Sequence, residues 1–147
     1  MGDEDLIRLY SQRILALAAD IPMADRLDAP DASARARSPL CGSVVTVDLR
    51  LRDGRIVAFG QDVKACALGQ ASASILARQV VGLGRTEIAR ARAQLAAMLK
   101  SDGPVPDAPF QDYEVLLPAR DYRNRHASIL LALDATLEAF DQAAKAA

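Results

Sequence analysis

The strongest constraint on the fold is an alternation of apolar and polar residues on both sides of one tight turn. In residues 44–52 every second side chain is apolar, which is the period of a strand with one buried face, and these side chains are Val45, Val47, Leu49 and Leu51. Asp53-Gly54 follows and predicts a type I′ hairpin turn, because both central residues of that turn need positive φ. The chain then returns as a second strand over residues 55–64.

Two further observations extend this hairpin into a sheet. The returning strand is expected to place Val57, Phe59 and Val63 on one face. A third strand is predicted at residues 31–37, where small apolar residues alternate with polar ones and the alanines face inward. Together the three strands predict an antiparallel sheet with one buried side.

Helices are predicted before and after the three strands along the chain. The first ends at Pro22 and carries an apolar stripe at helical spacing, formed by Ile7, Tyr10, Ile14 and Leu17. After the sheet, one helix is expected from near Leu68 and another from an N-cap at Thr86. The last helix carries a second stripe, formed by Leu130, Leu133, Leu137 and Phe140.

The order of these elements and the chain length set the fold class. A long connection over residues 105–117 separates the last two helices. The order α-β-β-β-α-α-α predicts an α+β fold in which helices cover one face of a three-stranded antiparallel sheet. A length of 147 residues predicts one domain, residues 1–147.

Composition excludes several classes of function. The 18 basic and 19 acidic side chains give a net charge of −1, which argues against a broadly basic nucleic-acid binder. The sequence has no run of about 18 apolar residues, so no membrane span is expected. The acidic start, Met1 to Asp5, does not resemble a secretory signal, and we expect a cytoplasmic protein whose two cysteines are free thiols.

The two cysteines are the first candidates for chemistry. Cys41 lies in a loop before one hairpin strand, and Cys66 lies after the other, just before a helix. In an antiparallel hairpin the start of one strand is opposite the end of the next, so both cysteines are expected at the same end of the sheet. This placement allows a metal, cluster or persulfide site, and it equally allows two buried thiols that pack as small apolar groups.

Other chemistry-bearing residues give weaker signals. His126 is the only histidine and lies near the start of the last helix, either as a metal ligand or as a polar surface group. Nearby Arg120, Arg123 and Arg125 form a basic patch that could meet an acidic partner or be a solvated face. The acidic residues of the strands and turn, Asp48 among them, are expected to be exposed, so no carboxylate pair for acid–base catalysis is predicted. The sequence also has no nucleotide-binding or hydrolase motif. We therefore expect no enzyme active site.

The segments LCGSVVTV (residues 40–47) and VKACALGQASAS (residues 63–74), with the Asp53-Gly54 turn between them, resemble the NifU N-terminal, IscU and SufU family. This resemblance extends from the first helix to the last. It implies iron–sulfur cluster assembly, with a cysteine desulfurase as partner and an iron–sulfur cluster or iron as cargo. Zinc is a further expectation, because the long connection before the last helix looks more like the SufU branch.

The resemblance also assigns site residues. The first two family cysteines correspond to Cys41 and Cys66, and the family aspartate two residues after the first cysteine corresponds to Ser43. An ungapped alignment places Ser128 where the family has a third cysteine, whereas a slip of two residues would place His126 there. The implied metal ligands are therefore Cys41 and Cys66, with His126, Ser43 and Ser128 as candidates, although a neutral hydroxyl is a poorer ligand than a thiolate.

Three functions follow from this assignment. The first is a scaffold that binds iron or a [2Fe–2S] cluster through Cys41 and Cys66, with a homodimer supplying four thiolates. The second is a zinc-dependent sulfur acceptor in which Cys41 takes a persulfide from the desulfurase. The third is a partner-binding protein that keeps the fold without cluster chemistry, which the serines at positions 43 and 128 motivate.

Overall fold

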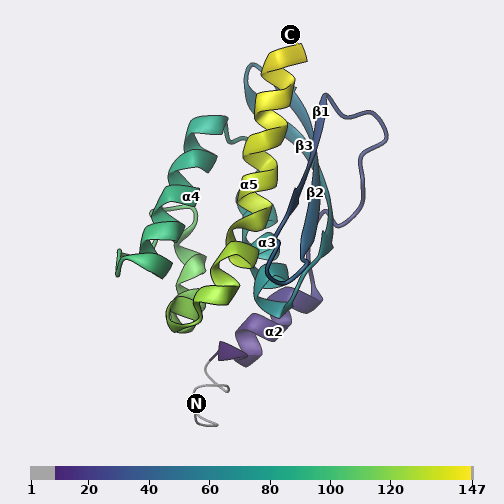
Figure 1. Cartoon of the computed structure of the whole chain (residues 1–147). Helices are drawn as coiled ribbons and strands as arrows, with labels where there is room; N and C mark the ends of the chain where they lie inside the picture. Colours follow the sequence, from purple (N-terminus) through teal and green to yellow (C-terminus); the bar gives the residue numbers. More distant parts are fainter. Residues whose placement is uncertain (1–8, 147) are drawn as a thin grey trace.

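The structure, a computed structural model, describes residues 9–146 and has the α+β architecture that the sequence predicts (Figure 1). Its elements follow one another as α2 (Gln12–Ala19), β1 (Ala32–Arg37), β2 (Val44–Arg52), β3 (Arg55–Lys64), α3 (Ala67–Gln79), α4 (Arg85–Lys100), the 3-10 helix η1 (Gln111–Asp121) and α5 (Arg123–Ala146). In this part of the chain no helix combines the length and apolarity needed to cross a membrane.

The three strands form one antiparallel sheet in the order β1-β2-β3. The predicted hairpin turn is confirmed, because Asp53 and Gly54 have φ values of 54° and 76°. Val57 departs from the prediction and is exposed. The register shifts beside it, so that Leu51 pairs with Ile56 and Arg50 pairs with Ala58. Val57 is therefore the unpaired extra residue of a bulge in β3 and points outward, and Ile56 takes its expected place in the core.

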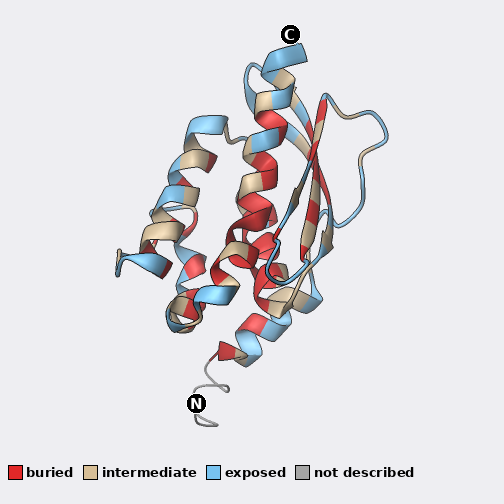
Figure 2. Ribbon diagram, viewed as in Figure 1, coloured by how far each residue is buried: buried red, intermediate tan, exposed pale blue. Residues whose placement is uncertain are grey.

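Helices α3 and α5 cover the inner face of the sheet, α4 packs against α5, and α2 packs against α3. Figure 1 shows α5 running between α4 and the sheet along its length. In Figure 2 the middle of α5 is mostly buried. The alanines of β1 face inward as predicted, since Ala32 and Ala34 are buried. Small side chains there let the long helix lie close to the strand.

Helix ends are less predictable than the strands. Gly84 rather than Thr86 precedes α4 as its N-cap, so that expectation is wrong. Gly84 forms a β-bridge with Arg55, and the side chain of Glu87 accepts a hydrogen bond from its N–H at 3.2 Å. The pairing with the end of the sheet therefore fixes where α4 begins.

The predicted first helix is confirmed only from Gln12 onward, because Tyr10 lies in a turn before α2. Ile14 is fully buried, and Tyr10 and Leu17 are partly buried against the core. The Ser11 hydroxyl caps α2 by accepting a hydrogen bond from the Ile14 N–H at 3.2 Å. The remaining residue of the stripe, Ile7, lies outside the described residues.

The segment of residues 20–31, which joins α2 to β1, covers the part of the outer face of the sheet around Asp48 and Gly60. A Cβ added to Gly60 would lie 2.4 Å from the carbonyl oxygen of Asp25, so this segment touches the backbone of β3. The N–H of Gln61 also donates to the carbonyl of Met23 at 3.0 Å. Only a glycine at position 60 permits so close an approach.

This covering buries Asp48, which the sequence analysis placed on an exposed position. Its carboxylate accepts hydrogen bonds from Arg26 at 2.6 and 3.0 Å, from the Leu27 N–H at 3.0 Å and from the Ser33 hydroxyl. Burial opposes ionisation of Asp48, but these donors outweigh it and hold the pKa of the carboxyl below its usual value. The expectation failed because strand alternation does not reveal a loop that covers the second face.

Candidate functional site

Both cysteines lie at one end of the sheet, beyond its last paired residues. Val44 of β2 pairs with Lys64 of β3, and each cysteine lies two or three residues outside this pair. Cys41 belongs to the loop that joins β1 to β2, and Cys66 is the N-cap residue of α3. The hairpin therefore determines which end of the molecule carries both thiols.

The loop before β2 presents Cys41 to solvent. Two backbone hydrogen bonds close the loop, from the Ser38 N–H to Ser43 at 2.8 Å and from the Gly42 N–H to Ser38 at 2.9 Å. Gly42 has a φ of +71°, a left-handed conformation that favours glycine at this turn. Cys41 is exposed at the tip, whereas Cys66 is half-buried.

Two serine hydroxyls connect the thiols. The sulfur of Cys41 lies 3.1 Å from the Ser43 hydroxyl, and this hydroxyl lies 3.2 Å from the hydroxyl of Ser128 on α5. The Ser128 hydroxyl is in turn 3.5 Å from the sulfur of Cys66. We call Cys41, Ser43, Cys66 and Ser128 the thiol–hydroxyl cluster. Both of its serines are buried, so the two hydroxyls are fixed beneath the thiols.

A close approach of α3 to α5 brings Ser128 into the cluster. A Cβ added to Gly69 would lie 2.6 Å from the Ser128 hydroxyl oxygen and 2.9 Å from the Cβ of Ala65. One turn later the Ser72 hydroxyl donates to the carbonyl of Ile129 at 2.5 Å. The small residues after Cys66 therefore let α5 contribute a side chain to a site otherwise built by loop and sheet ends.

The environment of Cys41 favours its thiolate. Hydrogen bonds with the hydroxyls of Ser38 and Ser43 lower the pKa of the Cys41 thiol to about 7. A thiol with this pKa is roughly half ionised at neutral pH, and the thiolate is the form that binds metals and attacks sulfur. Cys41 therefore combines exposure with nucleophilic character.

Ser38 is a site residue that the sequence analysis did not single out. It is buried, and its hydroxyl oxygen lies 3.4 Å from the sulfur of Cys41. The signal in the sequence is a serine three residues before Cys41 and a glycine directly after Cys41, which is typical of a tight turn. That pattern is common in loops, so it did not identify Ser38 by itself.

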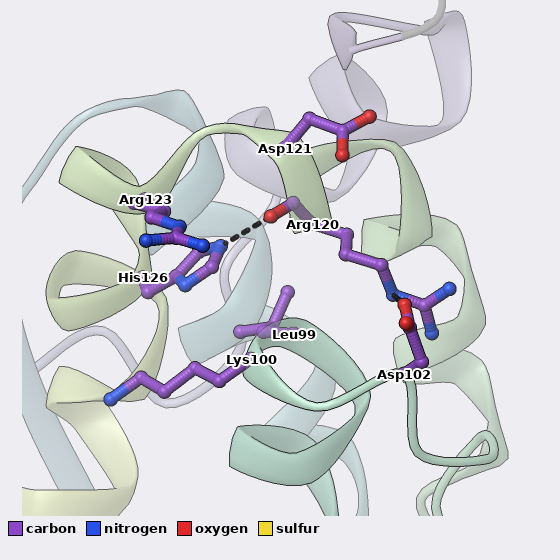
Figure 3. A pocket seen from close by; sticks show the side chains of 7 residues that line it. All are labelled: Leu99, Lys100, Asp102, Arg120, Asp121, Arg123 and His126. Atoms are coloured by element: carbon purple, nitrogen blue, oxygen red, sulfur yellow. Dashed lines mark hydrogen bonds and ion pairs between the residues drawn. The ribbon is translucent and has the colours of Figure 1, made fainter.

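His126 lies outside the thiol–hydroxyl cluster. Side chains two positions apart on a helix point to nearly opposite sides, so His126 and Ser128 diverge. The Nε2 of His126 lies 3.0 Å from the carbonyl oxygen of Ala119 and 3.1 Å from that of Arg120, so this nitrogen is the donor. Figure 3 shows the ring in a separate pocket of about 570 Å³, lined by Leu99, Lys100, Asp102, Arg120, Asp121, Arg123 and His126.

The distances between the donor atoms of the thiol–hydroxyl cluster suit a metal site, but the ligand types do not. Successive donor atoms are 3.1 to 3.5 Å apart, close to the edge of about 3.3–3.8 Å expected for tetrahedral zinc. However, no group of three histidine, cysteine or acidic side chains that could hold a metal occurs within residues 9–146. Two thiols and two neutral hydroxyls do not fit a zinc site, but they supply half of a four-thiolate set.

Comparison with solved structures gives close matches over nearly the whole chain. A NifU-like protein (N-terminal) from Brucella abortus, described as nitrogen-fixing, is 44% identical, covers 97% of this chain and 99% of its own, and superposes with a TM-score of 0.93. A candidate iron–sulfur cluster assembly scaffold for the SUF system from Fervidobacterium islandicum AW-1 is 17% identical, with 95% and 99% coverage and a TM-score of 0.83, and shows the shared fold. No protein-family model and no curated protein matches the chain.

Proposed function

Since the chain belongs to the NifU N-terminal, IscU and SufU family, we propose that it is a scaffold in iron–sulfur cluster assembly that holds iron or a [2Fe–2S] cluster on Cys41 and Cys66. The observation that carries this proposal is the convergence of the two thiols on a shared pair of buried hydroxyls at one end of the sheet. The name of the Fervidobacterium structure points to the same role.

The cluster is cargo, and each protomer would supply two thiolates for it. A [2Fe–2S] cluster takes four thiolate ligands, so two copies of the chain complete the set. The exposed position of Cys41 supports a shared cluster, because a ligand at the tip of a loop is accessible to a second copy. We therefore expect a homodimer in the loaded state.

The two serines would stabilise the thiolates without binding the cargo themselves. A hydroxyl can donate a hydrogen bond to a sulfur, and such bonds favour the ionised thiol. A site with two thiolates per chain binds its cargo less tightly than one with more charged ligands. A weaker hold suits a protein that must pass its cluster on to a recipient.

Anaerobic reconstitution tests the scaffold function. The chain is incubated with ferrous iron, cysteine and a cysteine desulfurase, and the iron and sulfide that remain after desalting are measured. About one iron and one sulfide per chain are expected for a cluster shared by two copies. The variants Cys41→Ala and Cys66→Ala are expected to retain neither. Leu40→Ala, which changes an exposed neighbour in the same loop, is the matched control and is expected to retain both.

Two results would contradict this function. Equal retention of iron by the parent and by both cysteine variants would show that the thiols are not the ligands. No retained iron in the parent, together with normal desulfurase binding, would favour a partner-binding protein without cluster chemistry.

A second candidate function is sulfur acceptance from a cysteine desulfurase. Its support is the exposure of Cys41 together with a pKa of about 7, the properties of a thiol that attacks a persulfide. The zinc that accompanies this role in SufU-like proteins has no fitting ligand set within the described residues 9–146. Both functions belong to the cytoplasm, where thiols stay reduced. Mass spectrometry after incubation with an active desulfurase tests sulfur acceptance. An added sulfur atom on Cys41 is expected, and an unmodified thiol would contradict this function.

A further inference from the structure

We propose that Cys66 is a resolving thiol, which attacks a persulfide on Cys41, releases sulfide and leaves a Cys41–Cys66 disulfide. This inference rests on the sulfur-acceptor function of Cys41 and adds a second step to it. Sulfur arrives on a persulfide at the oxidation level of elemental sulfur, whereas a cluster needs sulfide. Two electrons per sulfur must therefore be supplied, and this chain holds two free thiols at the same end of its sheet.

The placement of the thiols supports a direct reaction. Cys41 reaches the Ser43 hydroxyl at 3.1 Å, and Cys66 reaches the Ser128 hydroxyl at 3.5 Å. These two hydroxyls are themselves 3.2 Å apart. The thiols are thus linked through two hydroxyls, and the reaction requires the Cys41 loop to move its sulfur past these hydroxyls to Cys66.

The two thiols also differ in the way that a receiving and a resolving thiol should. Cys41 is exposed on a loop, and a Cβ added to the adjacent Gly42 would meet nothing within 4 Å, so this part of the loop has room to move. Cys66 is half-buried and is held at the start of α3. The exposed thiol can meet a large partner, and the sheltered thiol can react only after the loop folds back.

The composition of the cluster leaves both thiols free to react with each other. A zinc site would hold two cysteines as metal-bound thiolates and keep them apart. Within residues 9–146 no third histidine, cysteine or acidic side chain joins them to complete such a site. The serines at positions 43 and 128 therefore leave a pair of thiols where a metal site would otherwise compete.

The step balances without another reactant. The Cys66 thiolate attacks the inner sulfur of the Cys41 persulfide, a bond forms between the two cysteine sulfurs, and the bond to the outer sulfur breaks. The outer sulfur leaves as hydrosulfide with both electrons of that bond, and its proton stays with it. The two cysteine sulfurs are oxidised to a disulfide. An external dithiol then reduces the disulfide, so sulfide release and cluster holding alternate on the same two residues.

Single-turnover sulfide release tests the inference. The reduced full chain is loaded by a cysteine desulfurase and cysteine, separated from both without added thiol, and followed by sulfide assay and intact-mass measurement. The parent is expected to release about one sulfide per chain and to end lighter than the reduced, unloaded chain by the mass of two hydrogens, because the disulfide has formed. Cys66→Ser is expected to keep the extra sulfur on Cys41 and to release sulfide at least about tenfold more slowly until dithiothreitol is added. Leu40→Ala is expected to behave as the parent.

The outcomes separate this inference from the function on which it rests. A parent that keeps a stable persulfide on Cys41, or a Cys66→Ser variant that releases sulfide at the parental rate, would overturn the resolving role alone. A parent that acquires no persulfide would contradict sulfur acceptance and the resolving step with it. Loss of loading in Cys41→Ser with normal loading in Cys66→Ser would support the division of roles between the two thiols.

Discussion

The sheet carries two polar clusters, and they differ in how completely their hydrogen bonds are made. On the outer face, buried Asp48 is held by a cation, a backbone N–H and a hydroxyl. At the end of the sheet, the thiol–hydroxyl cluster has neutral partners joined at 3.1 to 3.5 Å. The first cluster fixes a loop on the fold. The second leaves its sulfur atoms available, as the proposed cluster-binding function requires.

The largest change expected from any substitution is a gain of zinc binding in the thiol–hydroxyl cluster. The double variant Ser43→Asp/Ser128→Cys supplies two charged ligands at positions whose spacing already suits zinc. At a free zinc concentration about 1,000 times the dissociation constant, binding would stabilise the folded chain by about 4 kcal/mol. Thermal unfolding with and without zinc measures this gain, and the parent is the control. An unchanged melting temperature in the double variant would show that the cluster is not shaped for a metal.

The next effect concerns the other cluster. Asp48→Asn removes the charge that Arg26 and the loop donors hold, and we expect a loss of about 2–3 kcal/mol in the free energy of unfolding. Asp62→Asn is the matched control, because this exposed residue pairs with Lys64 only at 3.9 Å. Urea unfolding compares them. Equal stability of the two variants would mean that Asp48 does not anchor the loop.

The same carboxylate predicts a dependence of stability on pH. The folded-state pKa of Asp48 lies below the unfolded value of about 3.9. Its contribution is therefore complete above the unfolded pKa and is lost as the pH falls through the folded pKa. The parent is expected to lose more stability than Asp48→Asn between pH 5 and more acidic conditions. Parallel curves for the two proteins would contradict this assignment.

A smaller effect is expected where α3 meets α5. Replacing a glycine inside a helix by alanine normally raises the free energy of unfolding by up to about 1 kcal/mol. Gly69→Ala, however, places a Cβ against the Ser128 hydroxyl. We expect a loss of about 1–2 kcal/mol from this overpacking. A double-mutant cycle with Ser128→Ala tests the contact, since removing the hydroxyl should recover part of the loss. Strictly additive effects would place the clash elsewhere.

The smallest effect is on the ionisation of Cys41. Ser43→Ala removes one of the hydroxyls that lower its pKa to about 7, so its pKa is expected to rise toward the usual value for cysteine. The thiolate fraction at pH 7 then falls severalfold, and alkylation of Cys41 by iodoacetamide slows in proportion. Peptide mapping over a pH series measures this at Cys41 alone. Thr46→Ala on β2 is the control, and an unchanged midpoint in Ser43→Ala would remove the hydroxyl from the explanation.

The contrast between the clusters also explains what the sequence could predict. The hairpin was predictable because alternation and the Asp53-Gly54 turn are local signals, and the placement of Cys41 and Cys66 at one end of the sheet follows from the hairpin. The burial of Asp48 was not, because a loop distant in the sequence covers it. Val57 was misplaced for a similar reason, since a bulge shows only in the pairing with the neighbouring strand.

The resemblance identified Ser43 and Ser128 as the changed positions of the site, and the structure places both between the thiols. The apolar stripe of α5 already favoured the alignment that places Ser128, and not His126, at the site, and the structure turns His126 away from the thiols. Ser38 was missed because a serine in a loop is a weak signal without knowledge of how the turn closes. Local patterns thus fix the positions of the backbone elements, whereas contacts between distant segments decide which polar side chains meet.

Native mass spectrometry of the anaerobically reconstituted chain tests the central claim, that two thiols per chain hold a shared cluster, most directly. We predict about two irons and two sulfides per dimer, an iron-free monomer, and no loaded dimer in Cys41→Ala or Cys66→Ala. A cluster retained by the monomer, or a loaded dimer that persists without either cysteine, would contradict the account.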